Sequence, residues 1–228
     1  MQPIEQLAFV LHSRPYREHQ HIVELLTKDE GKVSAIVYSG KTNKSNKKGL
    51  LQPFCPLNVL LKGQSQLKNL SRIEVSEKSY VLKGNFLYSG FYLNELLVKL
   101  LGEMSPCPAL FNNYQLSLAL LSQNQSIEPI LRKFELDLLD ELGFSLDFSP
   151  VFEQTATSFY YMPEEGFIPN TEKLRLPLFK KAHLQAISQE NLIDTDVLHS
   201  NKLLMRHIFN GLLGGKPLNS RKLFTKQK

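Results

Sequence analysis

The spacing of apolar residues changes character about a third of the way along the chain. Before residue 80, short runs rich in Val, Ile, Leu and aromatic residues alternate with Gly, Pro and charged residues, a pattern typical of β-strands. We predict five strands, at residues 7–12, 21–27, 33–39, 56–62 and 70–76. The first of them is expected to end at Arg14-Pro15. Five strands in so short a segment favour a small closed barrel.

After residue 80 the apolar residues recur at the spacing of a helix face. Five helices are predicted, at 86–104, 110–122, 127–142, 178–188 and 196–213. Gly143 and Gly214 are placed to cap the third and the last of them. The segment 144–178 is rich in Ser, Thr, Pro and aromatic residues and predicts an ordered insertion or a pair of short strands. The fold class is therefore α+β, with a barrel domain at 1–80 followed by an α-helical domain at 81–228.

The net charge of +5 is confined to the predicted barrel domain. Its eighty residues contain twelve Lys and Arg against seven Asp and Glu, whereas the remainder of the chain contains fifteen of each kind. Residues 31–73 hold eight basic residues and no acidic one. A field of one sign over such a span attracts a polyanion at long range, so nucleic acid is the first candidate ligand.

Composition narrows the class of protein further. With 42% hydrophobic and 21% charged residues, the chain is expected to form packed cores. No apolar run approaches the ~20 residues of a membrane span, and the N-terminus lacks a signal-peptide pattern, so we expect a cytoplasmic protein without membrane contact. Cys55 and Cys107 are the only cysteines. Because each lies among apolar residues and prolines, we expect both thiols in the core rather than in a disulfide or a metal site.

Four lysines cluster between the third and fourth predicted strands: Lys41, Lys44, Lys47 and Lys48. On a flexible loop, ammonium groups bind phosphates as mobile point charges without reading bases. We therefore expect sequence-tolerant, salt-dependent DNA binding by this loop, with Arg14, Arg17 and Arg72 as further contacts. Tyr16 and Tyr38 lie beside these cations and are weaker candidates for base stacking. A solvated surface hairpin without a ligand stays open as the alternative.

The sequence contains no pattern that nominates an enzyme. Neither a phosphate-binding P-loop nor a G-x-S-x-G nucleophile motif occurs. His12, His19 and His21 lack acidic or thiol partners at metal-ligand spacing, so we expect surface or core histidines. Asp194 and Asp196 precede a predicted helix, where such residues cap free amide groups. We therefore expect no catalytic site, no metal and no cofactor.

The third predicted helix carries a second candidate site. Arg132 and Lys133 lie beside the apolar Leu131 and Phe134 and interrupt a face that we expect to be exposed and otherwise acidic, with Glu128, Glu135, Asp137, Asp140 and Glu141. One interpretation is an i,i+4 ion pair between Glu128 and Arg132. The other is a corner that binds an anionic ligand, because an arginine fork suits a carboxylate better than a lysine does.

Several segments, in their order and spacing, resemble the bacterial RecO family of recombination mediators over nearly the whole chain. In the barrel part they are Ala8-Phe9-Val10-Leu11-His12-Ser13-Arg14-Pro15 and Leu51-Gln52-Pro53-Phe54. In the helical part they are Tyr88-Ser89-Gly90, Tyr92-Leu93-Asn94-Glu95-Leu96, Arg132-Lys133-Phe134-Glu135-Leu136, Leu142-Gly143, Glu164-Glu165-Gly166-Phe167, Gly214-Gly215-Lys216-Pro217-Leu218 and Ser220-Arg221.

The resemblance implies an N-terminal five-stranded OB-fold barrel followed by an α-helical domain. It also implies a protein without enzymatic activity that binds and anneals single- and double-stranded DNA. Such a protein helps to load RecA onto strands coated by single-stranded-DNA-binding protein, with RecR as a partner. The acidic, Phe-ended C-terminal tail of that coating protein is then the expected ligand of Leu131, Arg132, Lys133 and Phe134. Several family members carry a four-cysteine zinc module, and the absence of cysteine at 151–170 places this chain in the zinc-free branch.

Two other functions fit the residues themselves. An adaptor would use the basic barrel to bind an acidic protein partner and would never contact DNA. An RNA-binding OB-fold factor would prefer RNA to DNA of equal sequence. A steep salt dependence of oligonucleotide binding separates the DNA binder from the adaptor.

Overall fold

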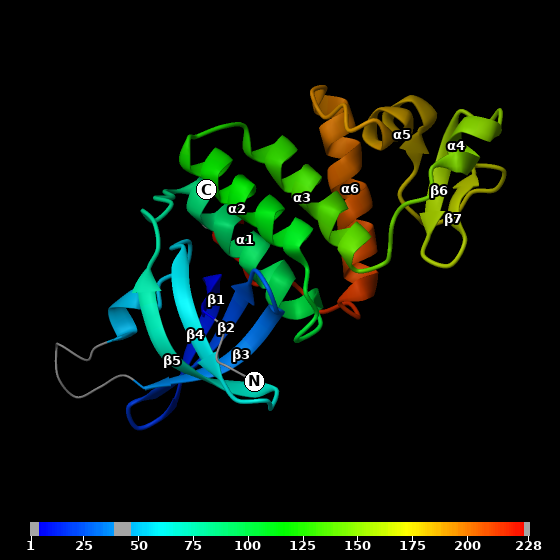
Figure 1. Ribbon diagram of the computed structural model, residues 1–228. Coiled ribbons are helices and arrows are strands. Elements are labelled where there is room, and N and C mark those ends of the chain that lie inside the picture. The colour runs from blue at the N-terminus through cyan, green and yellow to red at the C-terminus, as the bar shows by residue number, and fades with distance from the viewer. Residues whose placement is uncertain (1–4, 39–46, 226–228) are drawn as a thin grey trace. The chain divides into compact units, whose positions relative to one another are not determined.

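The computed structural model describes residues 5–38 and 47–225. Its N-terminal part is a closed barrel with the strand order β1-β2-β3-β5-β4 (Figure 1). The strands are β1 (Glu5–Arg17), β2 (Gln20–Thr27), β3 (Gly31–Tyr38), β4 (Leu57–Lys62) and β5 (Leu67–Val75), and a short 3-10 helix, η2 (Lys47–Leu50), precedes β4. Only β3 and β5 pair in parallel among these strands. The predicted OB-fold barrel is confirmed.

Alternation of side chains along β2 and β3 separates the inside of the barrel from its outside. Val23 and Leu25 of β2, together with Val33, Ala35 and Val37 of β3, are fully buried and fill the interior. Since successive side chains of a strand point to opposite faces, the residues between them lie on the outer surface. Register and burial therefore fix which residues of β1, β2 and β3 share the outer face.

The first strand runs through Pro15, so the predicted break at Arg14-Pro15 is wrong. Pro15 pairs with His21 of β2, next to an irregularity in the ladder. On its other side, β1 pairs with β4 only over Glu5 to Ala8. Within the described strands that edge is unpaired beyond Ala8, and an edge tolerates a residue without an N–H group.

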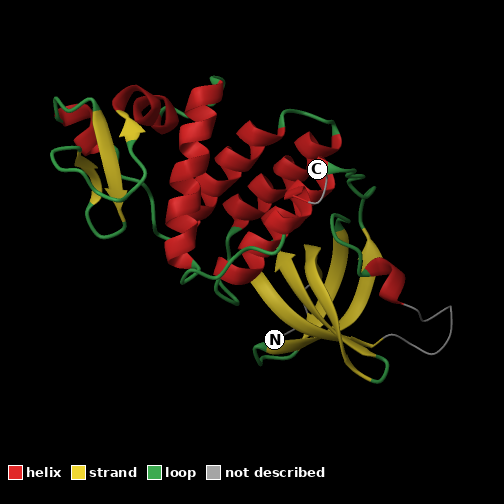
Figure 2. Cartoon of the chain, turned by 180° about the vertical axis from the view of Figure 1, so that it is seen from behind, coloured by secondary structure: helices red, strands yellow, loops and turns green. Residues whose placement is uncertain are grey.

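Three helices complete the same compact unit: α1 (Asn85–Leu100), α2 (Pro108–Ser122) and α7 (Arg221–Thr225). The helix α1 ends four residues before its predicted end, because the chain turns back at Leu101 to contact β3. There the Met104 amide donates to the Lys32 carbonyl at 2.8 Å, and the Lys32 ammonium donates to the Val98 carbonyl at 2.9 Å. These bonds tie the barrel to α1, which covers one end of it (Figures 1 and 2).

The compact units divide the chain at other places than the charge step does. One unit comprises Met1–Gln125 and Leu218–Lys228, and the other comprises Ser126–Pro217. Residue 80 marks the change from strands to helices, but α1 and α2 belong with the barrel. The predicted boundary at residue 80 reflects the change in the spacing of apolar residues along the sequence. The compact units instead reflect which elements pack together in the folded chain.

Gly31 occupies the closest approach between the barrel and the loop after α1. Its φ angle is +71°, in the left-handed region that favours glycine. A Cβ atom at this position would lie 1.8 Å from the Ser105 carbonyl oxygen, which is backbone and cannot rotate away. Glycine is therefore required here by both conformation and space.

A buried polar chain joins the helices to β1. The Tyr114 hydroxyl donates to Asn94 Oδ1 at 2.6 Å, and Asn94 Nδ2 donates to the Leu11 carbonyl at 3.0 Å. Leu11 is the extra residue where the β1–β2 register shifts between Val10 and His12. Burial raises the pKa of the Tyr114 hydroxyl, so it stays a donor at neutral pH. The side chain of Asn94 thus replaces the strand partner that the bulge removes.

The segment before α7 is bound to α1 through Glu95. This carboxylate accepts hydrogen bonds from the Asn219 and Ser220 amides at 2.8 Å and from the Ser220 hydroxyl at 2.6 Å, and it pairs with Lys99 at 2.9 Å. Burial by itself would raise the pKa of Glu95, but these donors outweigh it and lower the pKa to about 2. Residues that follow the second unit in sequence thereby rejoin the first.

Glu95 is expected to make the first unit sensitive to acid. Its folded-state pKa lies below the unfolded value, so the stability it contributes is present above about pH 4.5 and is lost as the pH falls towards 2. Glu95→Gln should lower the melting temperature at pH 7 and should flatten its decline between these pH values. Thermal melts of both proteins across this range measure the effect, and parallel curves would contradict it.

The second unit combines helices with a small sheet. Its elements are α3 (Ile127–Glu141), α4 (Ser149–Glu153), β6 (Ser158–Met162), β7 (Gly166–Pro169), β8 (Phe179–Lys180), α5 (Lys181–Ser188) and α6 (Thr195–Leu212). The predicted caps are confirmed: the Gly143 amide donates to Asp140, and Asp194 accepts from the amides of Asp196 and Val197. The pair of short strands predicted within 144–178 is the β6–β7 hairpin.

Aromatic packing holds this hairpin. Phe159 and Phe167 are buried, and the Phe167 ring stacks on Phe148 at 4.9 Å and meets Tyr161 edge-on at 5.2 Å.

The sequence from 151 to 170 offers no cysteine for a four-cysteine zinc module, so the residues present do not fit that metal site. Among the described residues, no group of three or more His, Cys, Asp and Glu could hold a metal ion. No helix in the described ranges is long and apolar enough to cross a membrane.

Candidate nucleic-acid interface

The outer surface of the barrel carries a row of side chains that crosses all five strands. Register places Arg14 of β1 opposite Ile22 of β2, Ile22 opposite Ile36 of β3, Ile36 opposite Asn69 of β5, and Asn69 opposite Lys62 of β4. Both cations and Asn69 are exposed, and the two isoleucines are half-buried. Arg14 and Lys62 form no ion pair with a described residue. We call these five residues the cation row.

A second row lies at the tip of β1, β2 and β3. Arg17 pairs with Gln20, and Gln20 pairs with Tyr38. The Arg17 guanidinium lies 5.0 Å from the centre of the Tyr16 ring, within range of a cation–π interaction. Tyr16 and Tyr38 are 44% and 60% exposed, so both rings are accessible to a flat ligand. Aromatic rings next to unpaired cations are the usual elements of single-strand binding surfaces.

Acidic residues border the cation row on the side of the helices. His12 pairs with Glu24, which pairs with Ser34, and the Ser34 hydroxyl donates to Glu103 at 2.7 Å. A phosphate would be repelled by Glu24 and Glu103 in this third row. On β2 and β3, the favourable part of the outer face therefore lies between the cation row and the strand tips.

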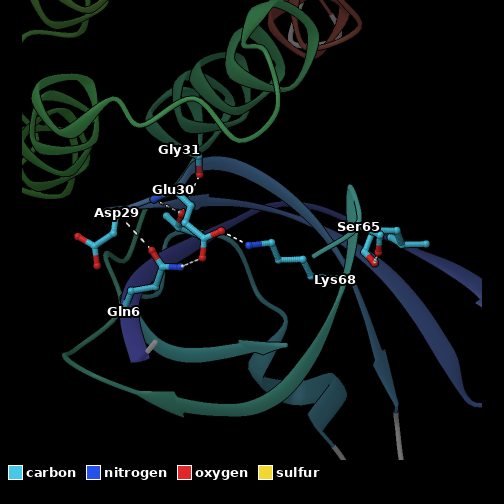
Figure 3. Close-up of polar contacts among 8 residues, drawn as sticks. Gln6, Asp29, Glu30, Gly31, Ser65 and Lys68 are labelled. Atoms are coloured by element: carbon cyan, nitrogen blue, oxygen red, sulfur yellow. Dashed lines mark hydrogen bonds and ion pairs between the residues drawn. The ribbon is translucent and has the colours of Figure 1, made fainter. Parts of the chain in front are cut away.

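Two acidic residues that flank the acid-free stretch 31–73, Glu30 and Glu74, form ion pairs with cations inside it. Lys68 is buried and forms an ion pair with Glu30, whose carboxylate also accepts from Gln6 at 2.8 Å (Figure 3). At the other end Arg72 donates to Glu74 at 2.8 Å, and this bond raises the pKa of the guanidinium. Both cations thus have internal partners.

The sequence-predicted DNA contacts therefore divide into groups. Arg14 and Arg17 lie on the outer face and have no acidic partner within the part of the chain that the structure describes, whereas Arg72 is paired with Glu74. Lys41 and Lys44 lie outside the described residues, and of Lys47 and Lys48 only the backbone, in η2, is described. Their part in DNA binding stays a prediction.

The structure adds Lys62, Ile22 and Ile36 to the candidate surface. Lys62 was visible in the sequence only as one of eight basic residues in the stretch. Its place beside Arg14 depends on the pairing of β4 with β5 and of β5 with β3. No local sequence signal reports such long-range register.

Two other aromatic residues of the barrel segment are not accessible for stacking on a base. Phe9 and Phe54 are buried, with Phe9 packed edge-on against Tyr114 at 5.2 Å. Cys55 and Cys107 are buried as free thiols, as predicted.

The residues predicted to bind a partner tail lie on α3. Leu131, Arg132 and Phe134 are 7%, 4% and 1% exposed, so only Lys133 is at the surface. The Arg132 guanidinium pairs with the fully buried Glu135 at 2.9 Å. The expected exposure of Arg132 and Glu135 is wrong, because this side of α3 packs inside the second unit. Tail binding there stays a prediction, and a ligand carboxylate would have to compete with Glu135.

The ion pairs of α3 differ from the simple interpretation of its sequence. Glu128 pairs with Lys202 of α6 at 2.5 Å rather than with Arg132. Lys133 pairs with Asp137 at 2.8 Å and with Glu190 at 2.6 Å. Partial burial would lower the pKa of Lys133, but the hydrogen bonds that its ammonium donates to these two carboxylates raise the pKa overall. The predicted Glu128–Arg132 pair is therefore wrong, because Glu128 pairs with a residue of α6 and Arg132 pairs with Glu135.

Comparison with known proteins gives one consistent result. Residues 1–78 match the family model "Recombination protein O N terminal", and residues 83–153 match "Recombination protein O C terminal". The chain is 40% identical over 225 residues to the DNA repair protein RecO of Tolumonas auensis, covering 96% of this chain and 93% of that one. It is 41% identical over 227 residues to RecO of Hahella chejuensis, with the same coverage, and 41% identical over 221 residues to RecO of Coxiella burnetii, covering 95% of each.

Three findings agree with one another: similarity at this level over nearly the whole chain, matches to both RecO family models, and an OB-fold barrel followed by helices. The chain belongs to the RecO family.

Proposed function

We propose that this protein acts in DNA repair by binding and annealing DNA strands through the outer face of its barrel. The observation that carries the proposal is the cation row, continued by Arg17, Tyr16 and Tyr38 at the strand tips. Family membership supports the same function, because the relatives are named DNA repair proteins. A DNA repair role places the protein with the bacterial chromosome in the cytoplasm.

The chemistry of the surface suits annealing. Two strands repel each other through their phosphates, so an annealing protein must supply positive charge without blocking the edges of the bases. Arg14, Arg17 and Lys62 supply charge, while the half-buried Ile22 and Ile36 between them offer no group that reads a base. Binding should therefore tolerate any sequence. The reaction breaks no covalent bond, so the proposal requires neither a catalytic residue nor a cofactor.

The wider mediator role rests on the family resemblance. We propose that the protein delivers strands coated by single-stranded-DNA-binding protein to RecA, with RecR as partner and with the coating protein's acidic tail as ligand of the second unit. Hydrogen exchange of the wild-type protein with an acidic, Phe-ended peptide tests the tail site directly. Protection confined to α3 is expected, and protection elsewhere would move the site.

Neutralising the described cations should weaken DNA binding. The variant Arg14→Gln/Arg17→Gln/Lys62→Gln is expected to bind oligonucleotides about tenfold or more weakly at low salt, similarly for unrelated sequences. The slope of log affinity against log salt should flatten by roughly 0.7 for each phosphate of a single strand that the variant no longer neutralises. Fluorescence anisotropy across a salt series gives both quantities, and annealing of complementary oligonucleotides should slow in parallel.

A matched control removes the same charge elsewhere. Lys173, Arg175 and Arg206 are exposed, lie in the second unit and form no ion pair with a described residue. Their triple Gln variant should keep most of the affinity and nearly the wild-type slope. Equal losses in both variants would show that only net charge matters and would remove the barrel face as the site. The basic loop is tested separately with Lys44→Gln/Lys47→Gln/Lys48→Gln.

The same titrations address the alternative functions. An adaptor would show no oligonucleotide binding even at low salt. An RNA-binding factor would bind RNA more tightly than DNA of equal sequence. The cation row gives no reason for such a preference, because Arg14 and Lys62 would bind phosphates, which RNA and DNA share.

A further inference from the structure

A pocket of about 380 Å³ opens between the middle of β1, the helix α1 and the helix α7. Leu11, Phe91, Val98 and Leu223 supply its apolar walls. Its volume lies at the lower end of the range for pockets that hold small organic groups. None of these residues belongs to the cation row.

The local structure around this pocket is built by a β-bulge. Leu11 is the extra residue of the bulge, and its carbonyl is held by Asn94, which is held in turn by the Tyr114 hydroxyl. Bulges re-aim side chains and are common beside binding sites. Because of the bulge, Leu11 departs from the regular alternation of side chains along β1 and lies against α1.

The polar groups in the pocket wall are already occupied. Asn94 uses its amide nitrogen on Leu11 and its oxygen on Tyr114. Both carboxylate oxygens of Glu95 accept hydrogen bonds from the Asn219–Ser220 segment. A charged group inside would find neither residue available, so the interior suits a flat, weakly polar body whose charge stays outside.

The mouth of the pocket continues the outer face of β1. His12 lines it and is exposed, two residues before Arg14 and about 7 Å away along the strand. The edge of β1 beyond Ala8 is unpaired within the described strands. A DNA single strand that follows this edge from Arg17 past Arg14 therefore reaches the mouth of the pocket. Glu24 lies in β2, on the opposite side of β1, and so does not line this path.

We propose that this pocket receives one unstacked base of a DNA single strand that runs along β1. The base would stack on the Phe91 ring and against aliphatic walls, while its phosphate stays at the mouth near His12 and Lys99. The inference rests on the proposed DNA binding by the barrel face. Such a pocket would anchor a DNA strand to the annealing surface through one base and would leave the other bases free to pair.

A base fits this pocket better than a peptide side chain does. A peptide entering it would bury amide groups next to Asn94 and Glu95, whose hydrogen-bonding atoms are already used. Leaving such groups unpaired opposes binding. A base buries its π faces and can keep its polar edge at the mouth.

Two variants test the pocket in different ways. Leu223→Trp fills it, and Phe91→Leu removes the stacking ring while keeping an apolar wall. Both should bind a dT oligonucleotide of about 15 nucleotides roughly fivefold to tenfold more weakly than wild type, the loss typical of one base stack. Both should bind an abasic strand of equal length and charge as wild type does, with an unchanged salt slope.

The control is Leu116→Trp, a similar enlargement at an exposed position of α2. It should leave both affinities unchanged, and thermal melts of all three variants exclude unfolding as the cause of a loss. Wild-type affinities of both pocket variants for the dT strand would overturn the proposal, and would leave the pocket to an apolar group of a protein partner. If wild-type protein binds neither strand, the proposed function itself fails.

Crosslinking gives a readout that needs no variant. A dT strand that carries 5-iodouracil is irradiated on the wild-type protein, and the modified residues are mapped by mass spectrometry. Adducts at Phe91 or His12 are expected. Adducts confined to Tyr16 and Tyr38 would support the barrel face and overturn the pocket.

Discussion

Gly31→Ala is expected to destabilise the first unit by at least about 3 kcal/mol, because the alanine would combine a left-handed backbone with a backbone clash. The φ angle of Gly31 is +71°, and a Cβ atom there would lie 1.8 Å from the Ser105 carbonyl oxygen. Relief would require the loop after α1 to move away from β3. In a protein of this size the melting temperature should fall by roughly 6 to 12 °C.

Gly102 provides the matched control in the facing loop. A Cβ atom at Gly102 meets nothing within 4 Å, and its backbone is not in the left-handed region. Gly102→Ala should therefore melt close to wild type. If Gly31→Ala also melts within about 2 °C of wild type, the close approach of β3 to Ser105 is absent in solution.

Removing one partner of the Arg132–Glu135 pair should cost about 3 to 5 kcal/mol, because the remaining buried charge would lose its oppositely charged neighbour. The Arg132 and Glu135 side chains are 5% and 0% exposed, and the N···O distance is 2.9 Å. Arg132→Ala is therefore expected to melt the second unit at a lower temperature.

A double-mutant cycle measures the pair. Arg132→Leu and Glu135→Leu should each destabilise strongly, whereas the double variant should regain much of the loss, since apolar residues of similar volume replace both charges. Lys133→Ala is the surface control and should cost less than about 1 kcal/mol, because the Lys133 side chain is 45% exposed in its ion pairs. Additive losses in the double variant would contradict the pairing.

The cycle also changes how tail binding should be tested. Lower peptide affinity in Arg132→Ala would report either the removal of an arginine that binds the peptide or a loosened second unit. Only a variant with wild-type thermal stability separates the two. Peptide binding to the Arg132→Leu/Glu135→Leu protein serves this purpose if that protein recovers its fold.

Local features of this fold could be predicted from the sequence. The strands of the barrel follow from short β-rich runs, and the caps at Gly143 and Asp194 follow from residue types with one dominant role at helix ends. The exposed Tyr16 and Tyr38 follow from their charged neighbours. Each of these depends on residues within a few positions of one another.

Pairings between distant residues could not be predicted in the same way. The stretch 31–73 contains no acid, but Glu30 reaches Lys68 across the barrel, and Arg72 pairs with Glu74 just beyond the stretch. A helical wheel gives Arg132 and Glu135 the same periodicity as surface residues, and only the packing of α3 shows that both are buried. Register and tertiary packing decide these cases.

The return of the chain from the second unit to the first has a consequence for biosynthesis. Glu95 of α1 emerges from the ribosome long before Asn219 and Ser220, the residues whose amides it binds. Until the whole of 126–217 has been translated, this carboxylate and the pocket beside it lack the α7 side. The barrel and α1 must therefore persist during synthesis in an incomplete form, and the nascent chain completes its first folded unit after its second.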